Sequence, residues 1–496
     1  MSTDPSGQVL PLSRGSWAEV LARHGQGHRF AGLLAAAVPG GTRLTVVLAL
    51  ADRLQGYDRL VPDELARVDS LTAHLPAAAW YERAMTDLHG LRVDGQPSPR
   101  PLVLPLPGQV SPPRPGGPAP SPALEPDEHV IGLHVDGPGM FTIPHGPVRS
   151  GVTESVEYLL ETPGEDISHL HVRVFAKHRG IQSRFSGLGL PDATLLAERV
   201  EGVASVAHAT AFAQAVESAL GVQAPVCAGL SRVLHAELER IANHVDVALR
   251  LSEAAGLSVA VSRLGWHKER VLRLVSQLCG NRFGRGVVIP GGVSRLPGLA
   301  GEQVVAALTG IADALLADAD ALMRTPSFLD RLRGTGPLDH ELAARHGALG
   351  PIGRGSGFDD DDRRLRPYAG YAQLCPEPVL GQAGDAQARL AVRLGEVRES
   401  VRLARAAALA LEEHRGEPTS VKLPAEDGRG LGWAEAPHGE VLYDVELRAG
   451  TVLRAAPRSA SLHNLPLFAT TFQGDIFTDF PFVEASFGLP IAGVVL

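Results

Sequence analysis

The chain has 496 residues, which is enough for two or more domains and a large buried core. With 44% hydrophobic and 20% charged residues its composition is globular, and its net charge of −9 argues against a general nucleic-acid-binding protein, whose binding face would show a basic excess. The N-terminus lacks a signal-peptide pattern and no apolar run approaches about 18 residues, so we expect a cytoplasmic chain without its own transmembrane segment. The cysteines, Cys227, Cys279 and Cys375, lie far apart and form no CxxC pair, which argues against disulfides or a thiolate-bound metal.

The small first domain has the pattern of a mixed α+β unit. Residues 43–50, RLTVVLAL, form a compact apolar run suited to a buried strand. Residues 77–89 have a helical pattern that Gly90 would end. We predict that this domain spans residues 1–104.

A proline-rich segment divides the sequence. The stretch at 105–126, PLPGQVSPPRPGGPAPSPALEP, contains nine prolines together with glycine and serine. Because such a composition cannot form a helix interior or a central strand, residues 105–127 are predicted to be a semi-rigid, extended linker. A large domain is predicted to follow, over residues 128–496.

The large domain begins with strand-like segments at 155–162 and 169–176, joined by the hairpin-type connection PGEDIS. Long helical patterns follow, and the first has apolar residues at three- and four-residue steps: Leu230, Leu234, Leu238, Ile241, Val245 and Leu249. Further helices are predicted at about 262–278 and 302–322, and a β element near 439–457. The predicted fold class is therefore α+β, with a mainly helical large domain that contains small β elements.

These segments resemble a known family along nearly their whole length. AAAWYERAMTDLHGLRVDG at 77–95 is similar to the signature of the 30-kDa-type subunit of respiratory complex I, the NADH:quinone oxidoreductase. The large domain resembles the 49-kDa-type subunit and its relatives, the large subunits of group 4 nickel–iron hydrogenases. The motifs that carry this resemblance are HGPVRSG (145–151), FAKHRGIQSRF (175–185), LSRVLHAELERIANHV (230–245), GNRFGRGVVIPGGVSR (280–295), GPIGRGSGFDDDDRRLRPYAGY (350–371) and SASLHNLP (459–466). A fusion of both modules is similar to the large subunit of formate hydrogenlyase and hydrogenase-4 complexes.

The resemblance places the metal-binding cysteines of the hydrogenase family at positions that hold other residues here. The family holds nickel and iron with two CxxC pairs, and these fall on Glu201 and Ala204, and on Pro490 and Gly493. Soft thiolates hold low-valent nickel and iron, and one carboxylate does not replace four sulfurs. The resemblance therefore implies a chain without a nickel–iron centre and without a bound metal. A harder ion at Glu201 is an alternative, but the sequence offers no evident partner ligand.

Flanking positions of the same motifs are partly retained and partly changed. The retained residues are Glu198, Arg199, Gly202, Ser205, His208, Asp479 and Ser486. Gln182 replaces a family glutamate, His438 replaces an arginine, and Tyr443 replaces a histidine. The surroundings of the centre have therefore changed together with its cysteines.

Two carboxylates match family positions that handle protons. By resemblance, Glu154 corresponds to the carboxylate that relays protons to the metal, and Asp361 with Arg363 corresponds to the family's D-x-R pattern. Glu154 would then be a buried acid with a raised pKa; the alternative is a solvated hairpin carboxylate. The acidic run at 359–362 is predicted to be a solvated loop, in which Asp361 is an ion-pair partner of an arginine near a subunit interface.

Two further pairs are candidates for cofactor contacts. By resemblance, His178 and Arg179 would face an iron–sulfur cluster carried by a separate small subunit, where a cation tunes the cluster's potential. The alternative is a helix-start turn in which Arg179 pairs with a structural carboxylate. His145 and Arg149 lie where complex I relatives line the quinone headgroup pocket, although Arg149 replaces the family's usual histidine.

The long helical pattern near 230–249 also carries polar residues. His235 and His244 are predicted to be packing or helix-surface histidines rather than ligands. Glu237, Glu239 and Arg240 are predicted to be ordinary ion-pair or interface residues.

The expected function follows from the resemblance. It implies the large subunit of a membrane-associated assembly, like complex I or hydrogenase-4, that couples electron transfer at a partner iron–sulfur subunit to membrane ion translocation. The partners would be a small, 20-kDa-like iron–sulfur subunit and antiporter-like membrane subunits. The chain itself would bind no cofactor and would lie on the inner face of the cell membrane through these partners. The alternatives are a non-catalytic scaffold and a formate hydrogenlyase subunit with an atypical metal site.

Overall fold

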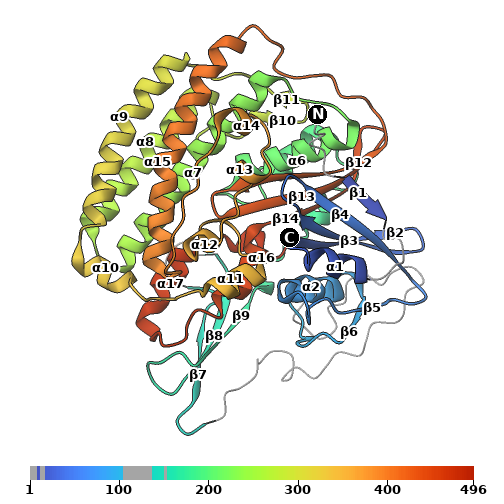
Figure 1. Cartoon of the computed structure of the whole chain (residues 1–496), viewed down its shortest axis with the longest axis vertical. Coiled ribbons are helices and arrows are strands. Elements are labelled where there is room, and N and C mark those ends of the chain that lie inside the picture. The colour runs from blue at the N-terminus through green and yellow to red at the C-terminus, as the bar shows by residue number, and fades with distance from the viewer. Residues whose placement is uncertain (1–7, 12–16, 104–136, 150–153) are drawn as a thin grey trace.

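The computed structural model describes residues 8–11, 17–103, 137–149 and 154–496 (Figure 1). The predicted linker at 105–127 lies outside these residues. A small, mainly β region formed by the first hundred residues packs beside a larger, mainly helical body (Figure 1). The predicted α+β fold class is confirmed.

The N-terminal region is built on a four-stranded sheet with the order β1-β4-β3-β2, in which β1 runs parallel to β4 and the other pairs are antiparallel. The predicted strand and helix are both confirmed, and Gly90 ends the helix with a φ of 64°. The elements of this region are β1 (Gln8–Pro11), α1 (Ala18–His24), β2 (Arg29–Val38), β3 (Gly41–Ala49), β4 (Leu54–Pro62), β5 (Arg67–Asp69), α2 (Ala79–His89) and β6 (Arg92–Asp94).

Both faces of this sheet are covered, which explains the continuous apolar run in β3. Leu44, Val46 and Leu48 belong to the core that includes side chains of α1 and α2. Val47 and Ala49, which alternate with them, belong to the core of the large domain. Because a strand buried on both faces needs no polar positions, its sequence does not alternate.

Long helices form the body of the large domain. These are α6 (Ser205–Leu220), α7 (Val226–Ala254), α8 (Ser258–Cys279), α9 (Gly301–Leu322) and α15 (Ala386–Ala410). Helices α7, α8, α9 and α15 lie side by side, with α7 in contact with both α8 and α15 (Figure 1). The predicted helices near 230–249, 262–278 and 302–322 are confirmed. None of the described helices is both long enough and apolar enough to cross a membrane.

A three-stranded antiparallel sheet packs against α6. It consists of β12 (Gly428–Ala436), β13 (Gly439–Arg448) and β14 (Thr451–Arg458). A Cβ on Gly430 would lie 2.4 Å from the Ala215 carbonyl oxygen, and one on Gly432 would lie 2.2 Å from that of Ala211. Only glycine therefore lets β12 approach α6 this closely, and the approach brings the turn after β12 towards the start of α6.

A second antiparallel sheet precedes these helices, and the chain ends in short elements. The predicted hairpin is confirmed as β8 (Glu157–Thr162) and β9 (His169–Arg173), with β7 (Phe141–His145) on the other edge of β8. The remaining elements are α4 (Ile181–Arg184), α5 (Leu190–Ala197), β10 (Val288–Ile289), β11 (Gly292–Val293), α10 (Pro326–Leu332), α11 (His340–His346), α12 (Gly350–Gly355), α13 (Asp362–Leu365), α14 (Tyr371–Leu374), α16 (Ala460–Phe468) and α17 (Phe480–Phe487).

Candidate functional site

The segments that hold the family's cysteine positions meet in the interior. Glu201 and Ala204 lie in the turn before α6, and both are fully buried. Gly493 lies in the final single-turn 3₁₀ helix at Ile491–Gly493, which begins after Pro490. A Cβ added to Gly493 would lie 1.5 Å from Glu201 Oε1, so these two positions are in direct contact.

The Glu201 carboxylate is surrounded by polar side chains from other segments. Glu201 Oε2 lies 3.2 Å from His208 Nε2 and 2.9 Å from His438 Nε2. The Ser459 hydroxyl donates to Glu201 Oε1. On the far side of the His208 ring, Nδ1 lies 2.9 Å from the Tyr443 hydroxyl. The sequence offered no evident partner for Glu201, because the sheet and α6 bring together residues that are more than two hundred positions apart.

Burial and these neighbours act in opposite directions on Glu201. Burial alone would raise the pKa of the carboxyl group, but His438 and His208 lower it well below its ordinary value. Burial raises the pKa of the Tyr443 phenol, and the nearby Glu201 charge raises it further. Glu201 is therefore a buried anion, and the Tyr443 phenol is neutral.

The donor set of this centre differs from that of a nickel–iron site. The positions given by the resemblance supply one carboxylate, from Glu201, and no thiolate. The free cysteines Cys227, Cys279 and Cys375 lie elsewhere. Within the described ranges, no group of three or more histidine, cysteine, aspartate or glutamate residues has an arrangement that could hold a metal ion. Because low-valent nickel and iron require soft sulfur ligands, the residues present do not fit that group.

Glu154 and Arg179 bind the backbone of Ala492, the residue before Gly493. Glu154 Oε2 accepts a hydrogen bond of 2.6 Å from the Ala492 N–H. Arg179 donates to the Ala492 carbonyl at 2.7 Å and to the Val200 carbonyl at 2.6 Å. Glu154 and Arg179, which the sequence suggested separately, thus bind the N–H and the carbonyl of the same residue, Ala492. Ala492 is adjacent to Gly493, which contacts Glu201.

His178 precedes Arg179 and is partly buried. Burial lowers the pKa of its imidazole, and a hydrogen bond with the Val495 backbone opposes this shift. Its Nδ1 atom is buried without a hydrogen-bond partner. At neutral pH the ring is therefore uncharged, and Arg179 is the permanent cation of the pair.

The candidate quinone-pocket residues form a separate aromatic cluster. Arg149 pairs with Glu484 at 2.8 Å, and its guanidinium lies 5.2 Å from the centre of the Tyr158 ring. The His145 ring lies 5.3 Å from that of Phe480. Burial lowers the pKa of His145, and the charge of Arg149 lowers it further. This cluster lies between β7, β8 and α17, and its contacts do not include Glu201.

Asp361 belongs to a third, fully buried group. It pairs with Arg363 at 2.7 Å, and the same guanidinium lies 3.2 Å from Glu237. Arg354 pairs with Glu396 at 2.7 Å and also reaches Asp361 at 3.6 Å. Burial would raise the pKa of Asp361, but Arg363 and Arg354 lower it well below its ordinary value. The predicted ion pair of Asp361 is therefore present.

The prediction of a solvated acidic loop at 359–362 is wrong for Asp361 and Asp362, which are both buried. Glu237 and Arg240 form ion pairs, as predicted, and both are fully buried. Asp362 pairs with Arg366, four residues further on, and Arg363 pairs with both Asp361 and the distant Glu237. The run of like charges by itself does not show that the arginines next to it are buried with it.

The helix histidines are packing residues, as predicted. His235 Nδ1 lies 2.8 Å from the Ser231 carbonyl within α7, and His244 Nε2 lies 2.8 Å from Glu396. Burial lowers the pKa of His244 to about 3, despite the neighbouring carboxylate. Glu239 instead accepts hydrogen bonds from the Val206 and Ala207 N–H groups at the start of α6. It caps the helix that carries His208.

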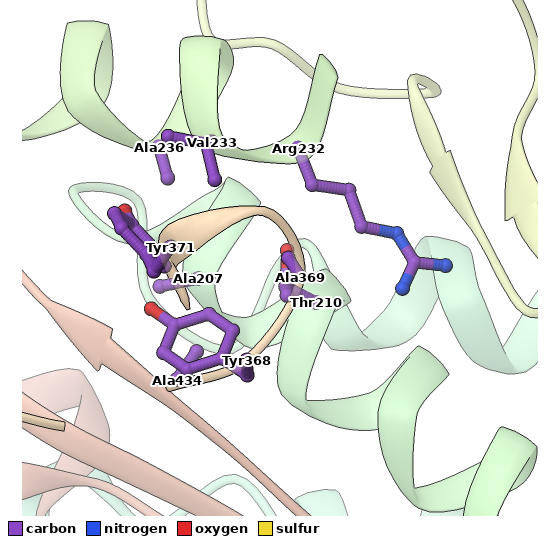
Figure 2. A pocket seen from close by; sticks show the side chains of 9 residues that line it. All are labelled: Ala207, Thr210, Arg232, Val233, Ala236, Tyr368, Ala369, Tyr371 and Ala434. Carbon is purple, nitrogen blue, oxygen red and sulfur yellow. The ribbon is translucent and has the colours of Figure 1, made fainter. Parts of the chain in front are cut away.

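A small pocket lies between α6, α7, β12 and the 368–371 turn (Figure 2). Its lining is mostly alanine and tyrosine, and the one charged side chain, Arg232, extends away from the others (Figure 2). The Arg232 guanidinium pairs with Glu217. Because no charged or ligand-type group faces the space, we assign the pocket no role.

Sequence reasoning missed how the Glu201 centre is assembled. His208, His438 and Tyr443 each stood out as a retained or changed position, and Ser459 lies in a matching motif, but nothing placed them in contact. The one indication in the sequence was that several positions around the family's metal centre had changed together. The hydrogen bonds that link them required the tertiary structure.

Comparison with protein families agrees with this architecture. Residues 260–428 match the family described as respiratory-chain NADH dehydrogenase, 49 Kd subunit. Residues 16–118 match the corresponding 30 Kd subunit. The chain thus joins a 30 Kd-type and a 49 Kd-type segment of the respiratory-chain NADH dehydrogenase family in one polypeptide, which confirms the resemblance seen in its motifs.

Several relatives are similar to this chain over most of its length. Formate hydrogenlyase subunit 5 from Escherichia coli K12 is 28% identical over 84% of this chain and 75% of its own length. Hydrogenase-4 component G from the same organism is 28% identical over 86% of this chain and 75% of its own length. The C/D subunit of NADH-quinone oxidoreductase from Nitrosospira multiformis is 28% identical over 68% of this chain and 59% of its own length. The chain is therefore homologous to subunits of formate hydrogenlyase, hydrogenase-4 and NADH-quinone oxidoreductase.

Proposed function

We propose that this chain is the large subunit of a membrane-associated oxidoreductase assembly, like complex I or hydrogenase-4, and that it works without a nickel–iron centre of its own. Homology to subunits of both kinds of complex supports the general assignment. The Glu201 centre is the observation that supports the absence of a nickel–iron centre. A buried carboxylate and two imidazoles occupy the region where the family resemblance places four thiolates.

In this proposal the chain acts at the surface of a small iron–sulfur subunit. Arg179 would supply a permanent positive charge near the partner's cluster and so raise its reduction potential. Glu154 would hold the neighbouring peptide group in place. Antiporter-like membrane partners would use the redox change for ion translocation, and the chain would lie on the inner face of the membrane through them.

The first test is to purify the assembly anaerobically through a tag on this chain and to measure its metal content. We expect iron in the amount that the partner's clusters require, no stoichiometric nickel, and no hydrogen uptake. One nickel per chain together with hydrogen uptake would overturn the proposal. Stoichiometric binding of another metal, lost in Glu201→Ala, would instead indicate an atypical metal site.

A second test separates an active role from that of a scaffold. Glu154→Gln and Arg179→Met would be introduced singly, with Arg295→Met as an exposed control. If the chain takes part in electron transfer, the two variants assemble normally and transfer electrons more slowly, whereas the control is unchanged. Full electron transfer in both variants would favour the scaffold.

A further inference from the structure

The segment at 490–496 lies against the start of α6 through a cluster of buried polar side chains. We propose that Glu201, with His208 and His438, is a polar clamp that fixes this segment and thereby positions Arg179. Glu201 is then a positioning residue that takes over the cross-linking role that metal–thiolate bonds would have. We call Glu201, His208 and His438 the carboxylate clamp.

The first argument is the compensation of the buried charge. The Glu201, His208, His438 and Ser459 side chains are all fully buried. An isolated carboxylate in such a place would be strongly unfavourable, so its charge has to be compensated by neighbouring polar groups. The Ser459 hydroxyl donates a hydrogen bond to Oε1, and Oε2 lies within ion-pair distance of the Nε2 atoms of both imidazoles, at 3.2 Å and 2.9 Å. The clamp thus joins the turn before α6, α6 itself, the β12–β13 turn and the start of α16.

The second argument is the fit between Glu201 and Gly493. A Cβ on Gly493 would overlap Glu201 Oε1 at 1.5 Å and would lie 2.5 Å from Ser459 Oγ. Gly493 does not have a positive φ, so its backbone does not require glycine. The requirement is for space alone. Any side chain at 493, including a cysteine, is therefore incompatible with the carboxylate in its present position.

The third argument links the clamp to Arg179. Ala492 precedes Gly493 and binds Glu154 through its N–H and Arg179 through its carbonyl. Arg179 also binds the carbonyl of Val200, the residue before Glu201. Beyond Gly493, Val494 and Val495 are buried in the core under β8. A shift of Glu201 against Gly493 would therefore move two of the three carbonyls that accept hydrogen bonds from the Arg179 guanidinium, the third being that of Arg199.

The clamp can be tested in the full chain with a double-mutant cycle of Gly493→Ala and Glu201→Ala. We expect Gly493→Ala alone to shift the unfolding equilibrium by about thirtyfold towards the unfolded state, because the added methyl displaces the carboxylate. In the Glu201→Ala background the same change should have a much smaller effect, since Glu201 Oε1 is gone and only the Ser459 hydroxyl, 2.5 Å from the added Cβ, still has to turn away. Equal effects in both backgrounds would overturn the clamp. If Glu201→Ala does not fold, Glu201→Gly takes its place in the cycle.

Titration with Zn²⁺, Fe²⁺ or Ni²⁺ provides an independent check on the same chain. We expect no stoichiometric binding that depends on Glu201. One equivalent of metal bound by the unmodified chain and lost in Glu201→Ala would overturn a metal-free clamp.

The positioning of Arg179 is tested in the assembled complex and rests on the proposed function. Arg179→Met should lower the midpoint potential of the partner's iron–sulfur cluster, and Gly493→Ala should shift it in the same direction. Arg295→Met should leave the potential unchanged. An unchanged potential in Gly493→Ala, with a shift in Arg179→Met, would overturn the positioning role. If Arg179→Met also has no effect, the proposed function fails at this point, while the result of the mutant cycle stands.

Discussion

Glu201 and Asp361 are both buried carboxylates of the large domain, but their surroundings differ. The partners of Glu201 are imidazoles and a hydroxyl, and a glycine leaves room for its oxygens. The partners of Asp361 are the guanidiniums of Arg363 and Arg354. By the motif resemblance, the first cluster lies at positions that correspond to family cysteines, and the second at the position of the family's D-x-R pattern.

The difference shows two ways in which a protein interior can hold a negative charge. Guanidiniums carry a permanent charge at any physiological pH, so the Asp361 cluster depends on the presence of each arginine. Imidazoles and hydroxyls offer fewer and more adjustable donors, so the Glu201 centre depends on the orientation of its neighbours and on free space at Gly493. Substitutions in each cluster, and a change of pH, should separate these two kinds of dependence.

The largest effect is expected in the Asp361 cluster. Arg363→Met leaves Asp361 and Glu237 without their shared guanidinium, and breaking a buried pair in this way should lower the free energy of unfolding by about 3–5 kcal/mol. Urea unfolding followed by circular dichroism would measure it. Arg364→Met is the matched control, because the neighbouring Arg364 forms a partly exposed pair with Asp359 and should cost under about 1 kcal/mol. Equal losses in the free energy of unfolding for Arg363→Met and Arg364→Met would contradict a stabilising role of the buried ion pairs of Arg363.

A smaller effect is expected at the Glu201 centre. Tyr443→Phe removes the hydroxyl that lies 2.9 Å from His208 Nδ1 and leaves that nitrogen buried without a partner. The free energy of unfolding should fall by about 1–2 kcal/mol. Tyr158→Phe is the control, because its hydroxyl partner, Glu484, is partly exposed and can bind water. If Tyr443→Phe lowers the free energy of unfolding by no more than Tyr158→Phe does, Tyr443 does not orient His208.

The smallest effect concerns pH and the histidine next to the Asp361 cluster. Burial lowers the pKa of His244 from 6.5 to about 3, so the folded chain keeps this ring neutral while the unfolded chain protonates it below about pH 6.5. The stability that His244 contributes is therefore present above pH 6.5 and is lost as the pH falls towards 3. Between pH 7.5 and 5.5 the unmodified chain should lose about 1 kcal/mol more than His244→Gln.

Urea unfolding at the two pH values would measure this difference. His74→Gln, at an exposed histidine, should behave like the unmodified chain. If His244→Gln keeps the full pH dependence, the ring is not held neutral in the folded state.

Much of the fold could be predicted from the sequence. The apolar steps of α7, the glycine after α2 and the compact apolar run of β3 each reflect a local rule, and the structure confirms them. The acidic run at 359–362 led to a wrong prediction of a solvated loop, because a solvated loop and a buried ion network have the same local charge pattern. What distinguishes them is the position of Arg354 and Glu396, and that depends on the packing of α12 against α15.

The candidate site was predictable only as separate residues. Glu154, Arg179 and Glu201 were each selected through the family motifs, but their meeting around Ala492 and Gly493 was not. His208 and His438 stood out as isolated positions, with no indication that both reach the same carboxylate oxygen.

The sequence by itself determined which chemistry is available: one carboxylate, from Glu201, and no thiolate at the positions that the motif resemblance aligns with family cysteines. It also determined the long helices and the covered strand, because these follow from the spacing of apolar residues along the chain. Only the tertiary structure decided that Glu201 is a buried anion between two imidazoles. The physical reason is that charge compensation and steric fit depend on atoms that are close in space and far apart in sequence, as at Gly493, where the missing side chain leaves the space that the carboxylate fills.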